Sequence, residues 1–482
     1  MRIDSHPILH FDRTQPIFFF YNGQKIKAFK GETIASALHA SGIKKLSCSV
    51  KYNRPRGFFC GIGKCSSCLM RVNGIPNVRT CIVPAENGMT VESREQRNLP
   101  SAEFLNGKGK SMDVEILVVG AGPAGVSAAI EAGNHGRSVL LVDENHVTGG
   151  QLIKQTHKFF GSKKERAGTR GIKIAEELEA EIKGMAEKGG IKILLGTSVF
   201  GYYGKNGKHV LGAVDKMKNI LYTIETEKVI FACGAQENML SFPGNDLPGV
   251  YGAGGVQTLM NVYGVKPGNK VLMIGAGNVG LIVSYQLLQA GIEVDRVVEA
   301  LPKIGGYSVH AAKLRRCGVP IYTSHSVKEV YGEERVEGAI VGRLDEKWNF
   351  VRGSEEDMKC DTVCLAVGLT PSARLLFQAG VKRKYIPEAG GYVAIHNNKM
   401  ETSVDGIYVA GDSSGIEEAS TAMLEGKIAG LSAAFSLGHV KNAEELMEEY
   451  AKTLDGMREG PFGSKARKAK KKILQEALNE GI

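Results

Sequence analysis

The stretch EILVVGAGPAGVSAAIEAG, residues 115–133, decides the fold of this chain. Four apolar residues after the glutamate predict a short buried strand, and the alanine-rich residues that follow predict a helix from Pro123 to about His135. Between strand and helix lies a GxGxxG loop formed by Gly120, Gly122 and Gly125. The first glycine suits a tight turn, the second lets a pyrophosphate approach the backbone, and the third lets the helix pack on the strand. Together they predict a doubly wound α/β unit.

An acidic residue completes this unit. Asp143 ends the next apolar run, SVLLVD, close to the distance of roughly 20 residues at which a carboxylate accepts from the ribose of an adenine dinucleotide. A glycine turn without a ligand is the alternative interpretation. The order of strand, loop, helix and acid favours a nucleotide site over that alternative.

The same pattern recurs in KVLMIGAGNVG, residues 270–280, whose glycines are Gly275, Gly277 and Gly280. We expect a second helix to about Gln289 and a second carboxylate, Glu299, at the end of VDRVVE. A carboxylate at this place favours the 2′-hydroxyl of NAD(H) over the 2′-phosphate of NADP(H), although Arg296 is nearby. Two such units predict two doubly wound domains.

A third motif, TSVDGIYVAGD at residues 402–412, returns to an apolar strand that precedes a helix rich in alanine and glycine. This return predicts that the second unit is inserted into the first. Gly411 and Asp412 would aim a carboxylate at the sugar chain of a cofactor while the helix N-terminus faces phosphate. Taken alone, the motif could also be a simple turn between strand and helix.

Four cysteines predict an iron–sulfur site. From residue 60 the chain reads CGIGKCSSC, and a fourth cysteine follows after twelve residues, which gives the set Cys60, Cys65, Cys68 and Cys81. This is the plant-type [2Fe-2S] spacing, and Gly61 and Gly63 would let backbone N–H groups converge on the sulfurs. Structural zinc is the alternative, but zinc sites usually pair two C-x2-C knuckles and this loop has one.

The first hundred residues predict a small β-grasp domain around this cysteine loop. Asn22-Gly23 between two β-rich runs predicts a hairpin, and ETIASALHA at residues 32–40 predicts a helix. Residues 99–112 lack apolar periodicity and are rich in Gly, Ser and Lys, so we expect a linker there.

The composition excludes a single small module and a disordered chain, because 482 residues with 43% hydrophobic and 23% charged content are typical of several globular domains. The net charge of +10 identifies no partner, and no nucleic-acid partner is expected. No secretory signal or apolar stretch of membrane-spanning length is visible, so we expect a cytoplasmic location. After residue 441 we expect an amphipathic helix that docks on the body, a GPFGS break, and a basic run, KARKAKKK, with a solvated face.

These motifs together resemble the two-dinucleotide-binding flavoproteins, with VTGGQL at 147–152 and KVIFACGA at 228–235 as further matches. In that family the first fold holds FAD and the inserted fold holds a nicotinamide nucleotide. The resemblance implies FAD contacts from Gly120, Gly122, Gly125, Asp143, Gln151, Gly411 and Asp412, and nucleotide contacts from Gly275, Gly277, Gly280 and Glu299. The disulfide branch of the family has a catalytic cysteine pair that this chain lacks. No role is expected for Cys48, Cys233, Cys317, Cys360 and Cys364.

A narrower resemblance covers nearly the whole chain. The runs KYNRPRGFFCGIGKC, PNVRTC and SFPGNDLPGVYGAGGVQTLMNVYGVKPG resemble α-type subunits of heteromeric amine and amino-acid dehydrogenases, such as those of sarcosine oxidase, hydrogen cyanide synthase, opine oxidase and dye-linked proline dehydrogenase. In these complexes a β-type flavoprotein oxidises the C–N bond and the α-type subunit receives electrons. The resemblance implies such a partner and a further electron acceptor. It also leaves NAD or ATP as alternatives to FAD in the first site, and FMN as a further cofactor at a subunit interface.

The resulting hypothesis is an electron relay between FAD, the cluster and NAD(P)H or a partner's flavin, for which no catalytic acid, base or nucleophile is expected. His157 and His310 are expected to be structural or surface residues. Arg54 and Arg56 would either bind a flavin phosphate, offset cluster charge, or lie on the surface. The alternative function is a self-sufficient NAD(P)H-dependent flavin and iron–sulfur reductase, and a scaffold with unreactive nucleotides is the least favoured.

The predicted architecture is α/β, with two doubly wound nucleotide-binding domains preceded by a ferredoxin-like β-grasp domain. The predicted boundaries are 1–100 for the [2Fe-2S] domain, 113–247 with 368–440 for the FAD domain, 248–367 for the inserted NAD(P) domain and 441–482 for the tail.

Overall fold

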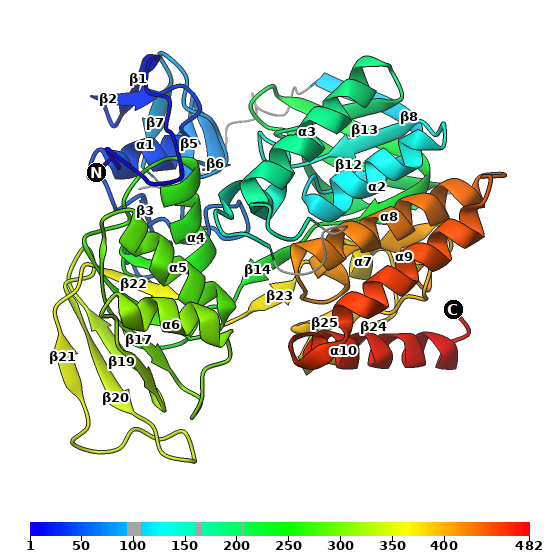
Figure 1. Cartoon of the computed structure of the whole chain (residues 1–482). Coiled ribbons are helices and arrows are strands. Elements are labelled where there is room, and N and C mark those ends of the chain that lie inside the picture. The colour runs from blue at the N-terminus through cyan, green and yellow to red at the C-terminus, as the bar shows by residue number, and fades with distance from the viewer. Residues whose placement is uncertain (94–107, 160–165, 205–206) are drawn as a thin grey trace. The chain divides into compact units, whose positions relative to one another are not determined.

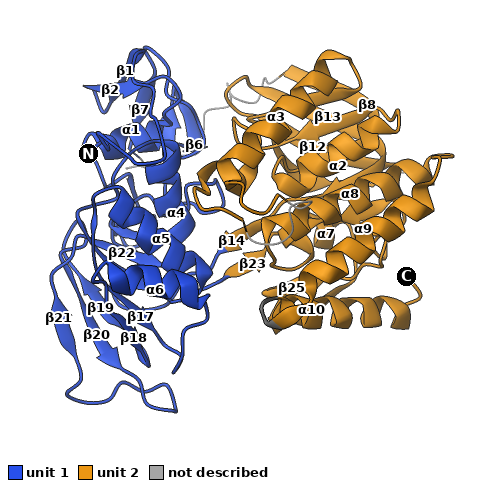
Figure 2. Cartoon of the chain, in the orientation of Figure 1, with its two compact units in different colours: residues 1–104, 237–368 blue, residues 105–236, 369–482 orange. Residues whose placement is uncertain are grey.

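The computed structural model describes residues 1–93, 108–159, 166–204 and 207–482. The chain forms two compact units, residues 1–104 with 237–368 and residues 105–236 with 369–482 (Figure 2). The chain passes between the units at β14 (Ala235–Glu237) and β23 (Leu369–Pro371), which pair with each other. The first unit therefore contains both the cysteine-rich N-terminal region and the second glycine loop.

The N-terminal part of the first unit is a five-stranded sheet in the order β2-β1-β7-β5-β6 with one helix (Figure 1). The strands are β1 (Pro16–Tyr21), β2 (Gln24–Phe29), β5 (Leu69–Val72), β6 (Ile75–Arg79) and β7 (Thr90–Glu92). Asn22 and Gly23 have φ angles of 47° and 81°, the left-handed values that a two-residue hairpin turn needs, so the predicted hairpin is confirmed. Helix α1 (Ile34–Ala40) begins at a capping box formed by Thr33 and Ser36.

The second part of the first unit is a parallel sheet in the order β15-β22-β16-β17-β18. Its strands are β15 (Val250–Gly252), β16 (Lys270–Ile274), β17 (Glu293–Glu299), β18 (Ile321–Thr323) and β22 (Thr362–Leu365). The neighbouring helices are α4 (Ala253–Gln257), α5 (Asn278–Gln289) and α6 (Ser308–Arg316). Strands β19 (His325–Tyr331), β20 (Gly338–Arg343) and β21 (Glu356–Met358) form a separate antiparallel sheet. The run of four buried residues in β16 is typical of a central parallel strand.

The second unit contains a seven-stranded sheet in the order β10-β9-β8-β13-β12-β11, with β26 also paired to β13. Its strands are β8 (Lys108–Val119), β9 (Val139–Val142), β10 (Ile191–Leu194), β11 (Ser198–Tyr202), β12 (His209–Asp215), β13 (Ile220–Phe231) and β26 (Ile407–Val409). The third motif thus returns to the first sheet, as predicted.

Part of the predicted linker at residues 99–112 is a strand. Residues 108–112 form the first half of β8 and pair with the first half of β13. They form a strand because the backbone groups of β13 need partners there, and Met112 is their only apolar side chain because this end of β8 is mostly exposed. The rest of the predicted linker, residues 99–107, lies outside the described residues.

Helices α2 (Pro123–Asn134) and α8 (Ala419–Ser436) pack tightly in the second unit (Figure 1). They approach closely because Gly426 and Gly430 have no side chain: a Cβ there would lie 2.1 Å from the Ala124 carbonyl oxygen and 2.3 Å from that of Ala128. The other elements of this unit are α3 (Gly171–Glu187), α7 (Arg374–Gln378), β24 (Arg383–Ile386) and β25 (Gly391–Ala394).

The tail forms α9 (Ala443–Arg458) and α10 (Gly460–Asn479). Met447 and Leu454 are buried in the core of the second unit, which confirms the predicted docking of this stripe. The predicted GPFGS break is wrong, because α10 begins at Gly460 and the helical chain is interrupted at Glu459. The expected solvated face of the basic run is also wrong for one residue: Lys470 is 4% exposed, because it faces buried carboxylates. Among the described residues, no helix is long and apolar enough to cross a membrane.

Candidate functional site

At two of the three glycines of the first glycine loop, neighbouring protein atoms leave no room for a side chain. A Cβ on Gly120, whose φ is 111°, would lie 2.2 Å from the Ala232 oxygen, and one on Gly125 would lie 1.7 Å from the Gly120 oxygen. A Cβ on Gly122 would meet only the Gly150 Cα, at 4.0 Å. Neighbouring protein atoms therefore explain the first and third glycines, and the second leaves space for a ligand to approach the backbone.

The acidic residue and a second glycine pair complete this loop. Asp143 Oδ2 accepts from the Ala121 amide at 2.6 Å. The Gly149 amide donates to the Ala121 oxygen at 2.8 Å, and a Cβ on Gly150 would lie 2.7 Å from the Gly122 Cα. The predicted residues Gly120, Gly122, Gly125 and Asp143 are thus brought together, and Gln151 is exposed directly after the glycine pair.

The second glycine loop repeats this construction. A Cβ on Gly275 would lie 2.4 Å from the Ala366 oxygen, and one on Gly280 would lie 2.0 Å from the Gly275 oxygen. A Cβ on Gly277 would have nothing within 4 Å. Glu299 Oε2 accepts from the Ala276 amide at 2.8 Å, as Asp143 does in the first loop. The four predicted residues of this site therefore also lie together.

A glycine pair that the sequence analysis missed completes the second site. Gly306 donates its amide to the Ala276 oxygen at 2.9 Å, and its Cβ would lie 2.8 Å from the Gly277 carbonyl carbon. The signal was present in the sequence: Gly149 and Gly305 each open a Gly-Gly pair six residues after the acid of their unit.

In the second site, the Arg296 guanidinium forms ion pairs with carboxylates. Its Nε donates to Asp295 Oδ2 at 2.8 Å and its Nη1 to Glu356 Oε2 at 2.5 Å. These hydrogen bonds and ion pairs raise the pKa of Arg296 against the effect of burial. The guanidinium is therefore already paired with two carboxylates. A positive charge that is neutralised in this way gives no reason to expect that Arg296 favours a 2′-phosphate.

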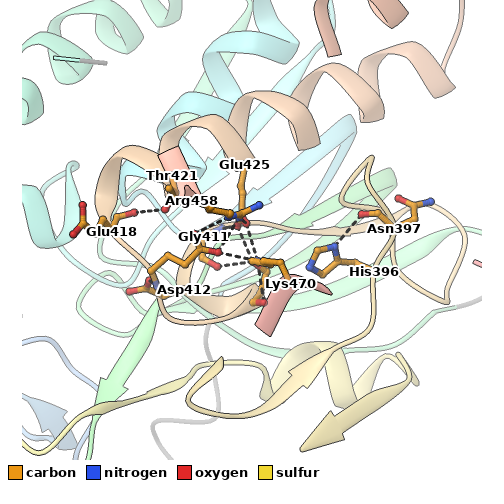
Figure 3. A network of polar contacts seen from close by, with 11 residues as sticks. His396, Asn397, Gly411, Asp412, Glu418, Thr421, Glu425, Arg458 and Lys470 are labelled. Atoms are coloured by element: carbon orange, nitrogen blue, oxygen red, sulfur yellow. Dashed lines mark hydrogen bonds and ion pairs between the residues drawn. The ribbon is translucent and has the colours of Figure 1, made fainter. Parts of the chain in front are cut away.

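The third motif forms a buried turn, the 3-10 helix Gly411–Ser414 (Figure 3). The Gly411 amide donates to Glu425 Oε2 at 3.0 Å, and the Glu417 amide donates to Asp412 Oδ1 at 3.2 Å. Burial raises the pKa of Asp412 to about 6, and the carboxylates of Glu425 and Glu417 add to this effect. Asp412 lies in the same unit as the first glycine loop, and Gly411 contacts α2, where a Cβ would lie 2.8 Å from the Ala124 Cβ.

The four predicted ligand cysteines lie together. Side-chain contacts join Cys60 to Cys65 and to Cys81, and join Cys68 to Cys81. Backbone amides of Ile62 and Cys65 hydrogen-bond to the Cys60 sulfur. Such bonds stabilise negative charge on sulfur. They depend on the loop conformation at Gly61 and Gly63, whose φ angles are 66° and 76°.

The chemistry of this set fits a metal cluster. Hydrogen bonding to Cys60 and burial raise the pKa of the Cys65 thiol, because four closely grouped sulfurs cannot all carry charge without a compensating cation. A two-iron cluster held by four thiolates would supply that cation.

The cysteine loop packs on the second nucleotide-binding part of its own unit. The Phe59 oxygen accepts from the Gly252 amide at 3.2 Å, and a Cβ on Gly255 would lie 1.9 Å from that oxygen. Phe59 and Cys60 belong to the apolar core that contains Val250 and residues of β16 and β22. The cysteine loop is thus seated on the segment where β15 leads into α4.

Arg54 and Arg56 belong to this same contact. Arg56 Nη1 lies 2.5 Å and Arg54 Nη1 lies 3.5 Å from Asp246 Oδ2. Their common role in the structure is therefore to join the N-terminal region to the loop before β15.

All nine cysteines of the chain are free thiols in the structure. Burial raises the pKa of Cys360 to about 12 and also raises the pKa of Cys364, so both are inert core thiols. His310 is buried and stacks on Tyr307, and burial lowers its pKa. His157 stacks on Phe159.

Comparison with known families agrees with this arrangement. Residues 114–426 match the model of the pyridine nucleotide-disulphide oxidoreductases. The chain belongs to this family. Residues 14–96 match the 2Fe-2S iron–sulfur cluster binding domain, which supports iron–sulfur over zinc at the four cysteines. This member of the family is therefore an iron–sulfur flavoprotein oxidoreductase with two dinucleotide-binding folds, and its cysteines within residues 114–426 include no C-x2-C pair.

Curated relatives of this family member are components of oxidases and of a synthase. The sarcosine oxidase α subunit of Rhizobium meliloti is 27% identical over 83% of this chain and 44% of its own length. An opine oxidase subunit of Agrobacterium tumefaciens is 29% identical over 66% of this chain and 65% of its own length, and hydrogen cyanide synthase subunit HcnB of Pseudomonas aeruginosa is 29% identical over 67% and 71%. The chain spans less than half the length of the sarcosine oxidase α subunits that it matches.

Among solved structures, L-proline dehydrogenase from P. horikoshii aligns with a TM-score of 0.70 and 26% identity, over 92% of this chain and 79% of that one. Thioredoxin reductase from T. acidophilum aligns with a TM-score of 0.54 and 23% identity over 67% of this chain and 99% of its own, which shows a shared fold.

Proposed function

We propose that this chain is the electron-transfer subunit of a heteromeric amine or amino-acid dehydrogenase. In this proposal Cys60, Cys65, Cys68 and Cys81 hold a [2Fe-2S] cluster, the first fold holds FAD and the second holds NAD(H). The observation that carries it is the joining of a cysteine cluster domain to a two-nucleotide fold without a redox cysteine pair. Its relatives include subunits of oxidases and a dehydrogenase of an amino acid.

The first fold suits FAD through three groups of its own. Gly122 leaves its backbone accessible, the amides at the start of α2 face that space, and Asp143 lies at the end of the neighbouring strand. Asp412, from the terminal turn, adds a second carboxylate. A bound flavin exchanges an electron pair with one partner and single electrons with an iron–sulfur centre.

The second fold suits NAD(H) because of the group at the end of β17. Glu299 would accept from an unmodified ribose hydroxyl and would repel a 2′-phosphate. Arg296, the nearby cation, is held by Asp295 and Glu356. We therefore expect NAD to bind at least about tenfold more tightly than NADP, a difference that calorimetric titration of each nucleotide measures.

The residues of this chain have positioning roles in the proposal. The cysteine loop donates backbone amides to sulfur, and the glycine loops expose amides for phosphate. No side chain of the described residues is assigned the transfer of a proton to or from an amine. The amine would accordingly be oxidised on a β-type flavoprotein partner, and FMN at the interface with that partner would be a further cofactor.

The deciding experiment is purification of the full chain with whatever co-purifies, followed by anaerobic additions under a visible spectrometer. Bleaching of flavin and cluster bands by an amine or amino acid, dependent on a co-purifying flavoprotein, would support the proposal. Rapid bleaching by NADH of the chain alone, with no amine-dependent bleaching in any preparation, would instead identify a self-sufficient reductase. A chain that never acquires flavin would refute FAD in the first fold and leave NAD or ATP for that site.

A further inference from the structure

Four charged side chains form a buried cluster beside the Gly411–Ser414 turn (Figure 3). Two are carboxylates near the turn, Glu417 and Glu425, and two are cations from the tail, Arg458 of α9 and Lys470 of α10. We call these four residues the buried charge cluster. Glu425, Arg458 and Lys470 are 2%, 7% and 4% exposed, so their interactions are almost fully withdrawn from water.

Direct contacts join this cluster to the turn. Glu425 Oε2 accepts from the Gly411 amide at 3.0 Å and lies 2.7 Å from Ser414 Oγ. Lys470 Nζ donates to the Ser414 carbonyl oxygen at 3.1 Å and to Ser414 Oγ at 2.6 Å. Both ends of the turn are therefore held by members of the cluster.

Both cations take part in several of these contacts. The three hydrogens of Lys470 Nζ have three acceptors: the two oxygens of Ser414 and Glu425 Oε1, at 2.7 Å. Arg458 makes a two-bond contact with Glu417 at 3.0 Å and 2.8 Å and a further bond to Glu425 at 2.6 Å. Their influence on a ligand would pass through the turn.

The charges at this place do not balance without the tail. Glu417, Glu425 and Asp412 bring three carboxylates to one turn, against the two cations. Removing one partner of a buried ion pair leaves an uncompensated charge, which is far more costly than losing an exposed pair. Without Lys470, Glu425 would be driven to protonate or to move, and Gly411 would lose its fixed acceptor.

The tail also docks through apolar contacts. Apolar residues of both helices are buried on the body, among them Leu454 of α9 and Ile473 of α10. Lys472, two residues after Lys470, forms an exposed pair with Glu388, in which its side chain is 51% exposed. The chain thus offers a buried and an exposed lysine on the same helix for comparison.

We propose that Arg458 and Lys470 are positioning residues for the flavin site, because they fix the Gly411–Ser414 turn and thereby the place of Asp412. The inference rests on the proposed occupancy of the first fold by FAD. It assigns a function to helices that follow residue 426, where the match to the oxidoreductase family ends. The two cations would touch no cofactor atom themselves.

The test compares Lys470→Met with Lys472→Met in the full chain. Titration of flavin-free protein with FAD, followed by fluorescence quenching, gives the dissociation constant. We expect Lys470→Met to weaken FAD binding by about tenfold or more, and Lys472→Met to leave it within about twofold of the wild type. Far-UV circular dichroism and iron content should be unchanged in both variants, because α10 and the cysteine loop belong to different compact units.

Charge rescue distinguishes positioning from general damage. Glu425→Gln keeps an acceptor for the Gly411 amide and removes the charge that Lys470 compensates. We expect the double variant Lys470→Met/Glu425→Gln to recover most of the lost FAD affinity, a coupling that a merely structural role of the lysine would not produce. Hydrogen exchange of the Gly411–Ser414 amides in flavin-free protein gives a second readout, with faster exchange in Lys470→Met than in Lys472→Met.

The outcomes separate this inference from the proposed function. Unchanged FAD affinity and unchanged exchange in a folded Lys470→Met would overturn the inference. If Lys470→Met fails to fold, a Lys470→Met/Glu425→Gln double variant that folds and loses turn protection but binds FAD as tightly as the wild type would overturn it as well. Absence of FAD binding in the wild type would refute the FAD proposal, and faster exchange in Lys470→Met would then still establish that the cation holds the turn.

Discussion

At the scale of single residues, side chains of the same amino-acid type have different environments in this protein. Asp143 and Asp412 are both expected at one cofactor, yet Asp143 accepts from two loop amides while Asp412 lies among further carboxylates. Lys470 and Lys472 are two residues apart on α10, yet of these two only Lys470 is buried. The chemistry of each residue therefore follows from its partners more than from its type.

A single substitution among the four ligand cysteines should remove the cluster and leave the flavin bound. Cys65→Ser removes a thiolate from the set, so we expect loss of the cluster absorbance and most of the iron, with flavin absorbance retained. Iron analysis and visible spectroscopy of the purified variant measure both. Cys317→Ser, which changes an exposed thiol, is the matched control and should keep full iron content. Unchanged iron in Cys65→Ser would refute the ligand assignment.

Asp412 should give the flavin-free protein a specific pH dependence. Burial raises its pKa from 3.8 to about 6, so the folded state binds this proton more tightly than the unfolded state. Its contribution to stability is therefore present below about pH 4 and is lost as the pH rises through about 6. We expect Asp412→Asn to raise the free energy of unfolding at pH 8 by about 3 kcal/mol, because each of the roughly two pKa units corresponds to about 1.4 kcal/mol, with a smaller gain at pH 4. Thermal unfolding at each pH measures the difference.

Other titratable groups near Asp412 change the stability in the opposite direction with pH, and their contributions must be subtracted. His396 is buried with its pKa lowered to about 4, so its contribution is present above pH 6.5 and is lost as the pH falls. The pairs of Glu417 and Glu425 with Arg458 and Lys470 are common to both proteins. Subtracting the wild type from Asp412→Asn at each pH removes the part of these contributions that does not depend on the charge of Asp412. A gain that does not change between pH 4 and pH 8 would contradict the raised pKa.

At the scale of elements, the two nucleotide sites are built alike from strand, glycine loop, helix, acid and glycine pair. In each loop the first and third glycines are required by neighbouring backbone, and the second is not. These local features could be predicted from the sequence, because a strand–glycine–helix pattern and an Asn-Gly turn are encoded by adjacent residues. The role of Lys470 could not, because its partner Glu425 lies 45 residues earlier and nothing in the basic run itself marks one lysine as buried.

Two glycines of the second loop should respond differently to alanine. Gly277→Ala meets no protein atom within 4 Å and should fold normally, but its methyl group would occupy the space expected for the nucleotide. We expect about tenfold weaker NAD binding by calorimetry with little change in melting temperature. Gly275→Ala, with a φ of 102° and a clash at 2.4 Å, should instead lower stability by about 2 kcal/mol or more. Equal NAD affinity in Gly277→Ala and the wild type would place the nucleotide elsewhere.

At the scale of the whole molecule, the cysteine domain and the second nucleotide-binding part belong to one compact unit. The contact between Phe59 and Gly252 joins residues nearly two hundred positions apart, and no periodicity in the sequence marks such a pairing. The separate parts of this unit could therefore be predicted from the sequence, whereas their grouping could not.

The grouping should make the cluster depend on the second nucleotide-binding part. Gly255→Ala places a methyl carbon 1.9 Å from the Phe59 oxygen and should displace the cysteine loop. We expect a substantial fall in iron per chain and a lower melting temperature of the first unit. Gly184→Ala, on α3 where a Cβ would have nothing within 4 Å, is the control and should keep its iron. Full iron content in a folded Gly255→Ala would show that the loop assembles its cluster independently of this contact.

The seating of the cysteine loop also has a consequence for the order of biosynthesis. The core that encloses Phe59 and Cys60 includes Leu365 of β22, which the ribosome makes about 300 residues later. At roughly 5–20 residues per second, this interval lasts on the order of 15–60 seconds. During that time the ligand cysteines have been synthesised, but the later residues of the core around Phe59 and Cys60 have not. Iron and sulfide can therefore reach the cysteines of the nascent chain before this core is complete.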